Sequence, residues 1–265
     1  MSLPFYEPWF AFAVLVVFVS AFIQGLSGFG MALLAVPLLL SQPGIGIHAV
    51  PCLTIVAFGT VVEVLYRYRR HLDLERTLWL AIPALVSTPL GVELLQRVPL
   101  PYLRAGVGIF LMLQSLYQLR PRAVSAPTAE ALVAAEALSR RDYSRRACVV
   151  VGLISGVLGG SMGMVGPLLA AYLIASGISR DSFKVTLNAV FMASLLFRTG
   201  NFALKGMLDA TWAVAGLSLL PVAWLGGKSG VYMDRFIPAA RFAVLVNVFL
   251  LGLGGWMFVK AWQEF

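Results

Sequence analysis

A long uncharged stretch near the start of this sequence limits what the chain can fold into. Residues 9–40 are 32 consecutive positions without Asp, Glu, Lys or Arg. A helix needs about 20 apolar residues to cross the roughly 30 Å hydrocarbon core of a bilayer. Of all 265 residues, 60% are apolar and 12% are charged, whereas soluble domains average about 45–50% and about 25%. The sequence therefore predicts an all-α, polytopic helical membrane protein, which we place in a bacterial cytoplasmic (inner) membrane.

The net charge of +8 comes from 20 basic and 12 acidic residues. In a soluble protein this balance would indicate nucleic-acid binding. Here the basic residues lie between apolar runs, as expected for loops that stay on the cytoplasmic side, so we predict no nucleic-acid partner. The two cysteines, Cys52 and Cys148, lie 96 positions apart. This spacing matches no metal-site pattern, and we predict neither a metal nor a cofactor.

The chain carries signs of an internal duplication. At a shift of 131 residues, the segment QGLSGFGM aligns with SGVLGGSM, so that Gly25 and Gly28 fall on Gly156 and Gly159. Further matches follow in the same order at nearly the same shift, which indicates a repeat. The predicted units are a first transmembrane repeat at 9–120, a hydrophilic cytoplasmic linker at 121–145 and a second transmembrane repeat at 146–262.

The first apolar run of each repeat is too long for one straight crossing, and glycines interrupt it. Glycine weakens a helix by about 1 kcal/mol relative to Ala, and glycine clusters allow the chain to reverse. If each run crosses once, basic residues divide 13 to 7 between the two sides; if each run returns, 15 of the 20 share one side. Because basic residues concentrate on the cytoplasmic side, we favour a glycine-broken hairpin, re-entrant or made of a half-helix, in each repeat. An odd number of crossings then makes the two repeats inverted.

The two glycine breaks are candidate binding elements for a small anion. Unwound backbone at membrane depth is tolerated only where it faces protein or water, and the helix that leaves each break points free N–H groups back toward it. Two related breaks could therefore converge on one anion, although small residues also allow close helix packing. The substrate-binding residues predicted in the breaks are Gly25, Ser27, Gly28 and Gly30 in the first repeat, and Gly159, Gly160, Ser161 and Gly163 in the second.

Polar side chains inside apolar runs are the second group of candidates. Lys184, Asn188 and Arg198 are predicted to bind substrate, because basic and amide groups in membrane segments usually face a cavity. The alternatives are that Lys184 snorkels into the headgroups and that Asn188 bridges two helices. Glu63 follows a long uncharged stretch and is the candidate for proton coupling, the alternative being an ion pair with Arg67 four residues away.

One motif indicates an enzyme. The letters GLSG in the first break have the Gly-x-Ser-Gly form of rhomboid-type intramembrane serine proteases. Its Ser27 would need a base, usually a histidine, and the only histidines are His48 and His71. The duplication argues against a nucleophile, since Ser27 aligns with Leu158. An intramembrane serine hydrolase stays an alternative, as does an anion channel, whose pore would present similar groups.

A glycine-rich turn followed by Pro-Leu-Leu opens both repeats, as GLSGFGMALLAVPLLL at 25–40 and GVLGGSMGMVGPLLA at 156–170. Each is followed by a Thr-containing segment and a basic-aromatic stretch that ends in Leu-Asp. This arrangement resembles the sulfite exporter TauE/SafE family of membrane transporters over essentially the full chain. The resemblance implies secondary transport, usually outward, of a small sulfur-containing or organic anion such as sulfite, sulfoacetate or a related sulfonate. It also implies protons as the coupling ion and no enzymatic activity, and a homodimer is the candidate assembly.

Overall fold

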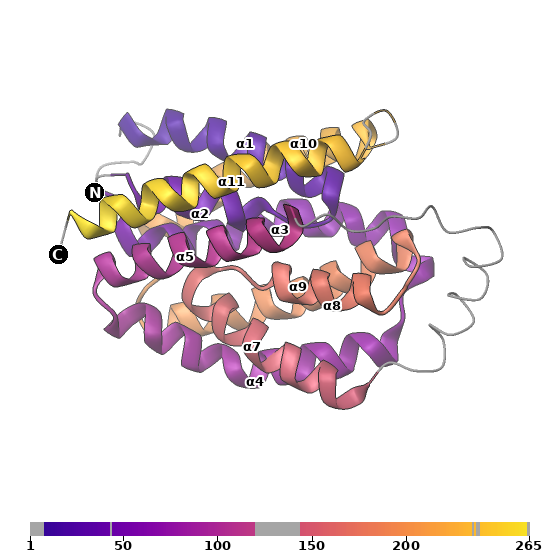
Figure 1. The fold of residues 1–265 in the computed structure, drawn as a ribbon. Coiled ribbons are helices and arrows are strands. Elements are labelled where there is room, and N and C mark those ends of the chain that lie inside the picture. The colour runs from indigo at the N-terminus through magenta and orange to yellow at the C-terminus, as the bar shows by residue number, and fades with distance from the viewer. Residues whose placement is uncertain (1–7, 43, 120–143, 235, 237–238, 264–265) are drawn as a thin grey trace.

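The computed structural model describes residues 8–42, 44–119, 144–234, 236 and 239–263 (Figure 1). Within these ranges the chain forms ten α-helices and no strand, which confirms the predicted all-α class. The predicted linker at 121–145 lies almost wholly outside the described residues. The helices of the first half are α1 (Pro8–Ser27), α2 (Met31–Leu40), α3 (Ala49–Tyr68), α4 (Leu74–Arg97) and α5 (Leu100–Leu119). Those of the second half are α7 (Arg145–Met162), α8 (Gly166–Ala175), α9 (Arg180–Leu204), α10 (Ala210–Met233) and α11 (Ala239–Trp262).

Most of these helices have the length and composition of membrane spans. Seven helices of the described part are long and apolar enough to cross a bilayer. Large apolar side chains such as Leu15, Val86 and Leu245 point outward and are more than 60% exposed, as expected for a surface in contact with lipid. By contrast, α2 and α8 have only 10 residues each. At 1.5 Å per residue each extends about 15 Å, half of a hydrocarbon core.

Each half opens with a hairpin of one long and one short helix. The chain reverses between α1 and α2 at Gly30, where φ is 117°, and between α7 and α8 at Gly163, where φ is 71°. Both angles are easily reached only by glycine. In the second hairpin Cys148 near the start of α7 lies 3.1 Å, Sγ to OH, from Tyr172 near the end of α8. The second chain segment therefore returns to the end of the bundle where it entered.

The first hairpin returns in the same way, but it enters from the opposite end. The rings of Trp9, in the first turn of α1, and of His48, just before α3, both contact Trp212, with centroids 5.6 and 4.9 Å away. At the other end of α3, Tyr68 lies 5.5 Å from the ammonium of Lys184. Helix α7 also begins at this end of the bundle. Its first residue, Arg145, pairs with Glu75, which follows α3 in the chain.

Packing between the two halves follows a reciprocal pattern. Helix α1 packs on α10 and α7 packs on α4, while α3 contacts α10 and α9 contacts α4. The pairs α3 with α9 and α5 with α11 complete the bundle. In Figure 1, α4 and α7 lie along one edge and α1 and α10 along the opposite edge. Exchanging the halves converts α1–α10 into α7–α4 and α3–α10 into α9–α4, and it converts α3–α9 and α5–α11 into themselves. Two inverted repeats would give this pattern, and the repeats stay a prediction.

Equivalent residues also begin equivalent helices. Asp73 precedes α4 and its carboxylate accepts a hydrogen bond from the backbone N–H of Arg76, 3.1 Å away. Asp209 precedes α10 and accepts in the same way from the N–H of Trp212 at 2.9 Å. These aspartates end the two Leu-Asp pairs of the sequence, and each satisfies one of the N–H groups that a helix start leaves without an internal partner.

Candidate anion-binding site

A cavity of about 60 Å³ lies between the two hairpins and α9. One water molecule needs about 10–15 Å³ of such space, so this cavity accommodates a few waters or an ion with a few heavy atoms. Gly30 lines it from the first hairpin and Gly163 from the second. The structure thus brings the two predicted glycine breaks to one cavity.

The short helices begin at this cavity. Met31, Ala32 and Leu33 line it from the first turn of α2, and Gly166 and Pro167 line it from the first turn of α8. The first N–H groups of a helix have no partner within the helix, and the aligned peptide dipoles give this end a partial positive charge. Two half-helices therefore direct their positive ends at the same volume.

Arg198 is the charged residue of the cavity wall. Its side chain lies on α9 and the residue is only 4% exposed. One guanidinium nitrogen, Nη1, donates a hydrogen bond to the carbonyl oxygen of Gly159. Its Nε has no partner, and no carboxylate pairs with the guanidinium, anywhere in the described part of the chain. A buried cation without a counter-ion is strongly unfavourable, so the site as it stands favours an anion.

Three uncharged polar side chains share the wall with Arg198. Ser194 is 2% exposed, and its hydroxyl has no hydrogen-bond partner among the described residues. Thr54 of α3 uses its hydroxyl hydrogen on the carbonyl of Val50 at 2.8 Å, so its oxygen is left as an acceptor. Gln24 of α1 contributes a buried amide. None of the three was predicted, although Ser194 precedes Arg198 by four residues and so lies on the same helix face.

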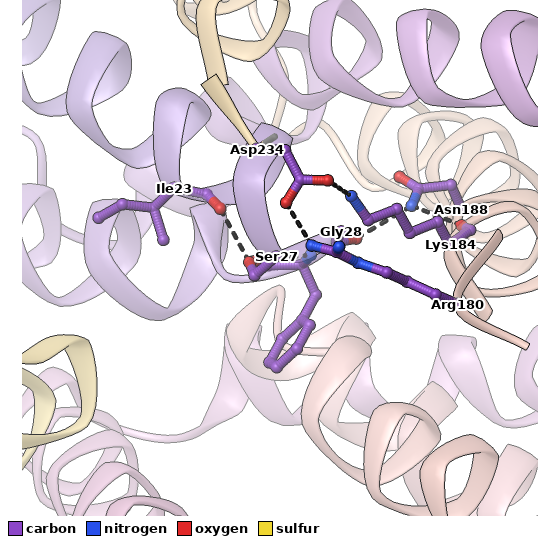
Figure 2. Close-up of polar contacts among 8 residues, drawn as sticks. Ile23, Ser27, Gly28, Arg180, Lys184, Asn188 and Asp234 are labelled. Carbon is purple, nitrogen blue, oxygen red and sulfur yellow. Dashed lines mark hydrogen bonds and ion pairs between the residues drawn. The ribbon is translucent and has the colours of Figure 1, made fainter. Parts of the chain in front are cut away.

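Lys184 and Asn188 belong to a separate cluster nearer one end of the bundle, which Figure 2 shows. The Lys184 ammonium lies 2.7 Å from Oδ2 of Asp234, at the end of α10, and Arg180 binds the other carboxylate oxygen. Asn188 donates from Nδ2 to the carbonyl of Gly28 at 2.9 Å. Neither Lys184 nor Asn188 lines the cavity. In this conformation, Lys184 and Asn188 therefore do not face the same cavity as Arg198, although all three were predicted to bind substrate.

Other predicted glycines make close helix contacts instead. A Cβ at Gly25 would lie 2.2 Å from the carbonyl oxygen of Gly227 in α10, and one at Gly160 would lie 2.4 Å from that of Thr88 in α4. Ser161 donates its hydroxyl to the carbonyl of Val157, 2.8 Å away in its own helix. At the two glycines the geometry matches the packing alternative, and the Ser161 hydroxyl is satisfied within its own helix.

Ser27 and Glu63 also lie outside the cavity wall. The Ser27 hydroxyl lies 2.8 Å from the carbonyl oxygen of Ile23 and also contacts the backbone of Phe29. No histidine bonds to it within the described ranges, and His48 instead stacks on Trp212. Glu63 is half-buried on α3, and the structure records no ion pair between it and Arg67 among the described residues.

Comparison with known proteins gives one family. The model of the family described as sulfite exporter TauE/SafE matches residues 13–257. No curated protein and no solved structure matches the chain. The matched range begins in α1 and ends in α11, and it includes both hairpins and the cavity between them. Because the match covers nearly the whole chain, this protein belongs to the sulfite exporter TauE/SafE family of membrane transporters.

Proposed function

We propose that this protein is a secondary transporter that exports a small sulfur-containing or organic anion of the sulfite, sulfoacetate or sulfonate class. The observation that carries the proposal is Arg198, a buried guanidinium without a carboxylate partner in the described chain, on the wall of a cavity where two helix N-termini meet. Ionisable groups within membrane segments usually mark a substrate or ion pathway. Binding an anion would neutralise this charge and satisfy the free Nε and the Ser194 hydroxyl.

The arrangement of the hairpins supports a carrier. Broken helices that enter from opposite ends and meet near the middle of a bundle are a common plan for secondary transporters, which expose a central site alternately to each side. The cavity touches both hairpins and α9, so a rocking movement of either hairpin would open it. Proton coupling through Glu63 and a homodimeric assembly stay predictions.

The hydrolase alternative is weaker than the transporter. A serine nucleophile requires a base within about 2.6–3.2 Å of its hydroxyl, whereas Ser27 Oγ contacts backbone oxygens of its own turn. The transporter proposal instead uses the two groups on the wall, Arg198 and Ser194, that have unsatisfied hydrogen-bonding atoms.

Flux in reconstituted vesicles tests the proposal. Purified protein in liposomes should move sulfite at a saturating rate, and Arg198→Gln should lower this rate about tenfold to hundredfold, because a hydrogen bond to a charged group contributes about 1.5–3 kcal/mol. Arg198→Lys, which keeps the charge, should retain more flux than Arg198→Gln. The control is Lys228→Gln, which removes the same charge from an exposed position beside Trp224. Equal flux in wild type and Arg198→Gln would remove this site from the mechanism.

A further inference from the structure

We infer that the cavity selects singly charged anions, so that hydrogensulfite and monosulfonates are carried. Dianions are not carried, and these include the sulfite dianion, sulfate and sulfoacetate, whose sulfonate and carboxylate are both charged. This inference rests on the proposed function and narrows it. Its basis is the count of charges on the wall: Arg198 is the one ionisable residue that lines the cavity. An anion with one negative charge and the guanidinium together form a neutral pair.

The ionisable groups of the neighbouring helices do not add to the charge at the site. On α3, Glu63 and Arg67 are outside the wall. On α9, Lys184 is also outside it, and its ammonium pairs with Asp234, which also binds Arg180. The segments of α1, α2 and α8 within the described ranges contain no ionisable residue except Tyr172, which bonds with Cys148 away from the wall.

A second negative charge at this site would have no partner. The N–H groups of α2 and α8, the Ser194 hydroxyl and the Gln24 amide stabilise an anion through dipoles, but none carries a full charge. Apart from the Thr54 hydroxyl, the other side chains of the wall are apolar and include Val36, Met164 and Phe191. In such a low-dielectric surrounding, an uncompensated charge is far more costly than in water.

The apolar wall also defines the uncharged part of the substrate. Three or four heavy atoms around one charged centre fit the small volume, and a methyl group could contact the side chains of Met164 and Phe191. Hydrogensulfite and methanesulfonate share this size and charge. Hydrogensulfite further crosses with its own proton attached, so this proton needs no carboxylate on the cavity wall, and the wall contains none.

The pH dependence of two fluxes in the same vesicles tests the inference. At constant total sulfite, the monoanion becomes scarcer by roughly tenfold for each pH unit above the pKa of hydrogensulfite, whereas methanesulfonate keeps a single charge throughout. We expect the rate of sulfite transport at subsaturating concentration to fall by this factor relative to the methanesulfonate rate, after subtraction of the leak through protein-free vesicles. The methanesulfonate rate reports any pH effect on the protein itself.

The other outcomes contradict either monoanion selection or the proposed function. A sulfite rate that stays level relative to methanesulfonate would overturn monoanion selection and leave sulfite transport intact. Transport of sulfite without methanesulfonate would also overturn it, since both ions carry one charge and have similar size. If neither ion moves faster than in protein-free vesicles, the proposed function itself fails.

A variant with a second cation gives an independent test. Gln24→Lys places an ammonium on the wall from α1, and Gln24→Met removes the amide without adding charge. In wild type and Gln24→Met, excess sulfate should not inhibit methanesulfonate transport. In Gln24→Lys, the concentration of sulfate required for inhibition should fall at least about tenfold. This corresponds to a change of about 1.4 kcal/mol in the binding free energy of sulfate. Inhibition of the wild type by sulfate as strong as by unlabelled methanesulfonate would refute the inference.

Discussion

Arg198 and Asn188 make equivalent contacts with the two halves of the protein. Arg198 donates to the carbonyl of Gly159 and Asn188 to that of Gly28, and these two glycines are aligned by the 131-residue shift. Both donors lie on α9. One helix of the second half thus holds the ends of the first helices of both hairpins, and only Arg198 also reaches the cavity.

The sequence predicted part of this site because some signals are local. A cation such as Arg198 inside an apolar run can be recognised from the sequence without knowing what it contacts. The same holds for glycines such as Gly30 and Gly163 in a broken helix. The Lys184 contact was not predictable, since Asp234 lies 50 residues away and no periodicity links the two. Gln24 and Thr54 were missed for a related reason: which face of α1 or α3 meets the cavity depends on tertiary packing.

Substitution of a packed glycine tests the contact between α7 and α4. A Cβ at Gly156 would lie 2.1 Å from both the carbonyl oxygen of Ala84 and the hydroxyl of Ser87. Gly156→Ala should therefore lower the free energy of unfolding by about 1–3 kcal/mol, seen as a lower midpoint of thermal unfolding in detergent. Gly252→Ala is the matched control, because nothing lies within 4 Å of a Cβ there. Equal midpoints for the two variants would contradict the packing.

At the scale of elements, the short helix α2 is anchored at its outer end by cations. Arg104 of α5 donates from Nη2 to the carbonyl of Leu40 at 3.1 Å, and Lys260 of α11 donates to that of Ser41 at 2.9 Å. The last carbonyls of a helix lack internal partners and carry partial negative charge. These contacts satisfy them and hold α2 with its N-terminus toward the cavity.

The ion cluster at the end of α10 gives a prediction about α9. Asp234→Asn leaves the Lys184 ammonium, whose side chain is 3% exposed, without its carboxylate. Loss of one partner of a buried pair costs about 3 kcal/mol or more, so the variant should unfold at a clearly lower temperature. Glu75→Gln serves as control, because its pair with Arg145 is exposed on both sides and such pairs contribute about 0–1 kcal/mol. A similar small loss in both variants would show that the Asp234 cluster does not stabilise the start of α9.

At the scale of the molecule, the sequence predicted the class of fold and the hairpins, but not how the hairpins pack. Chain length, uncharged runs and glycine clusters are properties of single segments, and the distribution of basic residues distinguished returning from crossing hairpins. The exchange of partners, with α1 on α10 and α7 on α4, is a tertiary property that no local pattern contains. In Figure 1, α1 begins and α11 ends at the same end of the bundle, and α7 begins at the opposite end.

Labelling from one side of the membrane tests the inverted arrangement. On a cysteine-free background, Arg70→Cys and Ser144→Cys should react with an impermeant thiol reagent only from the cytoplasmic side, because 15 of the 20 basic residues belong to loops of that end. Pro99→Cys and Gly206→Cys should react only from the other side, where Gln96 bonds to the carbonyl of Lys205. Reaction of all four cysteines from one side would refute the arrangement.

The most direct test of the central claim is the position of a bound anion. Hydrogenselenite has the charge and nearly the shape of hydrogensulfite, and its selenium can be located by anomalous diffraction from crystals grown with it. We predict a selenium peak in the cavity between the two glycine turns, with an oxygen at 2.7–3.2 Å from Nε of Arg198 and lost in Arg198→Gln. A peak that instead lies at Arg180 and Lys184 and persists in Arg198→Gln would contradict the account.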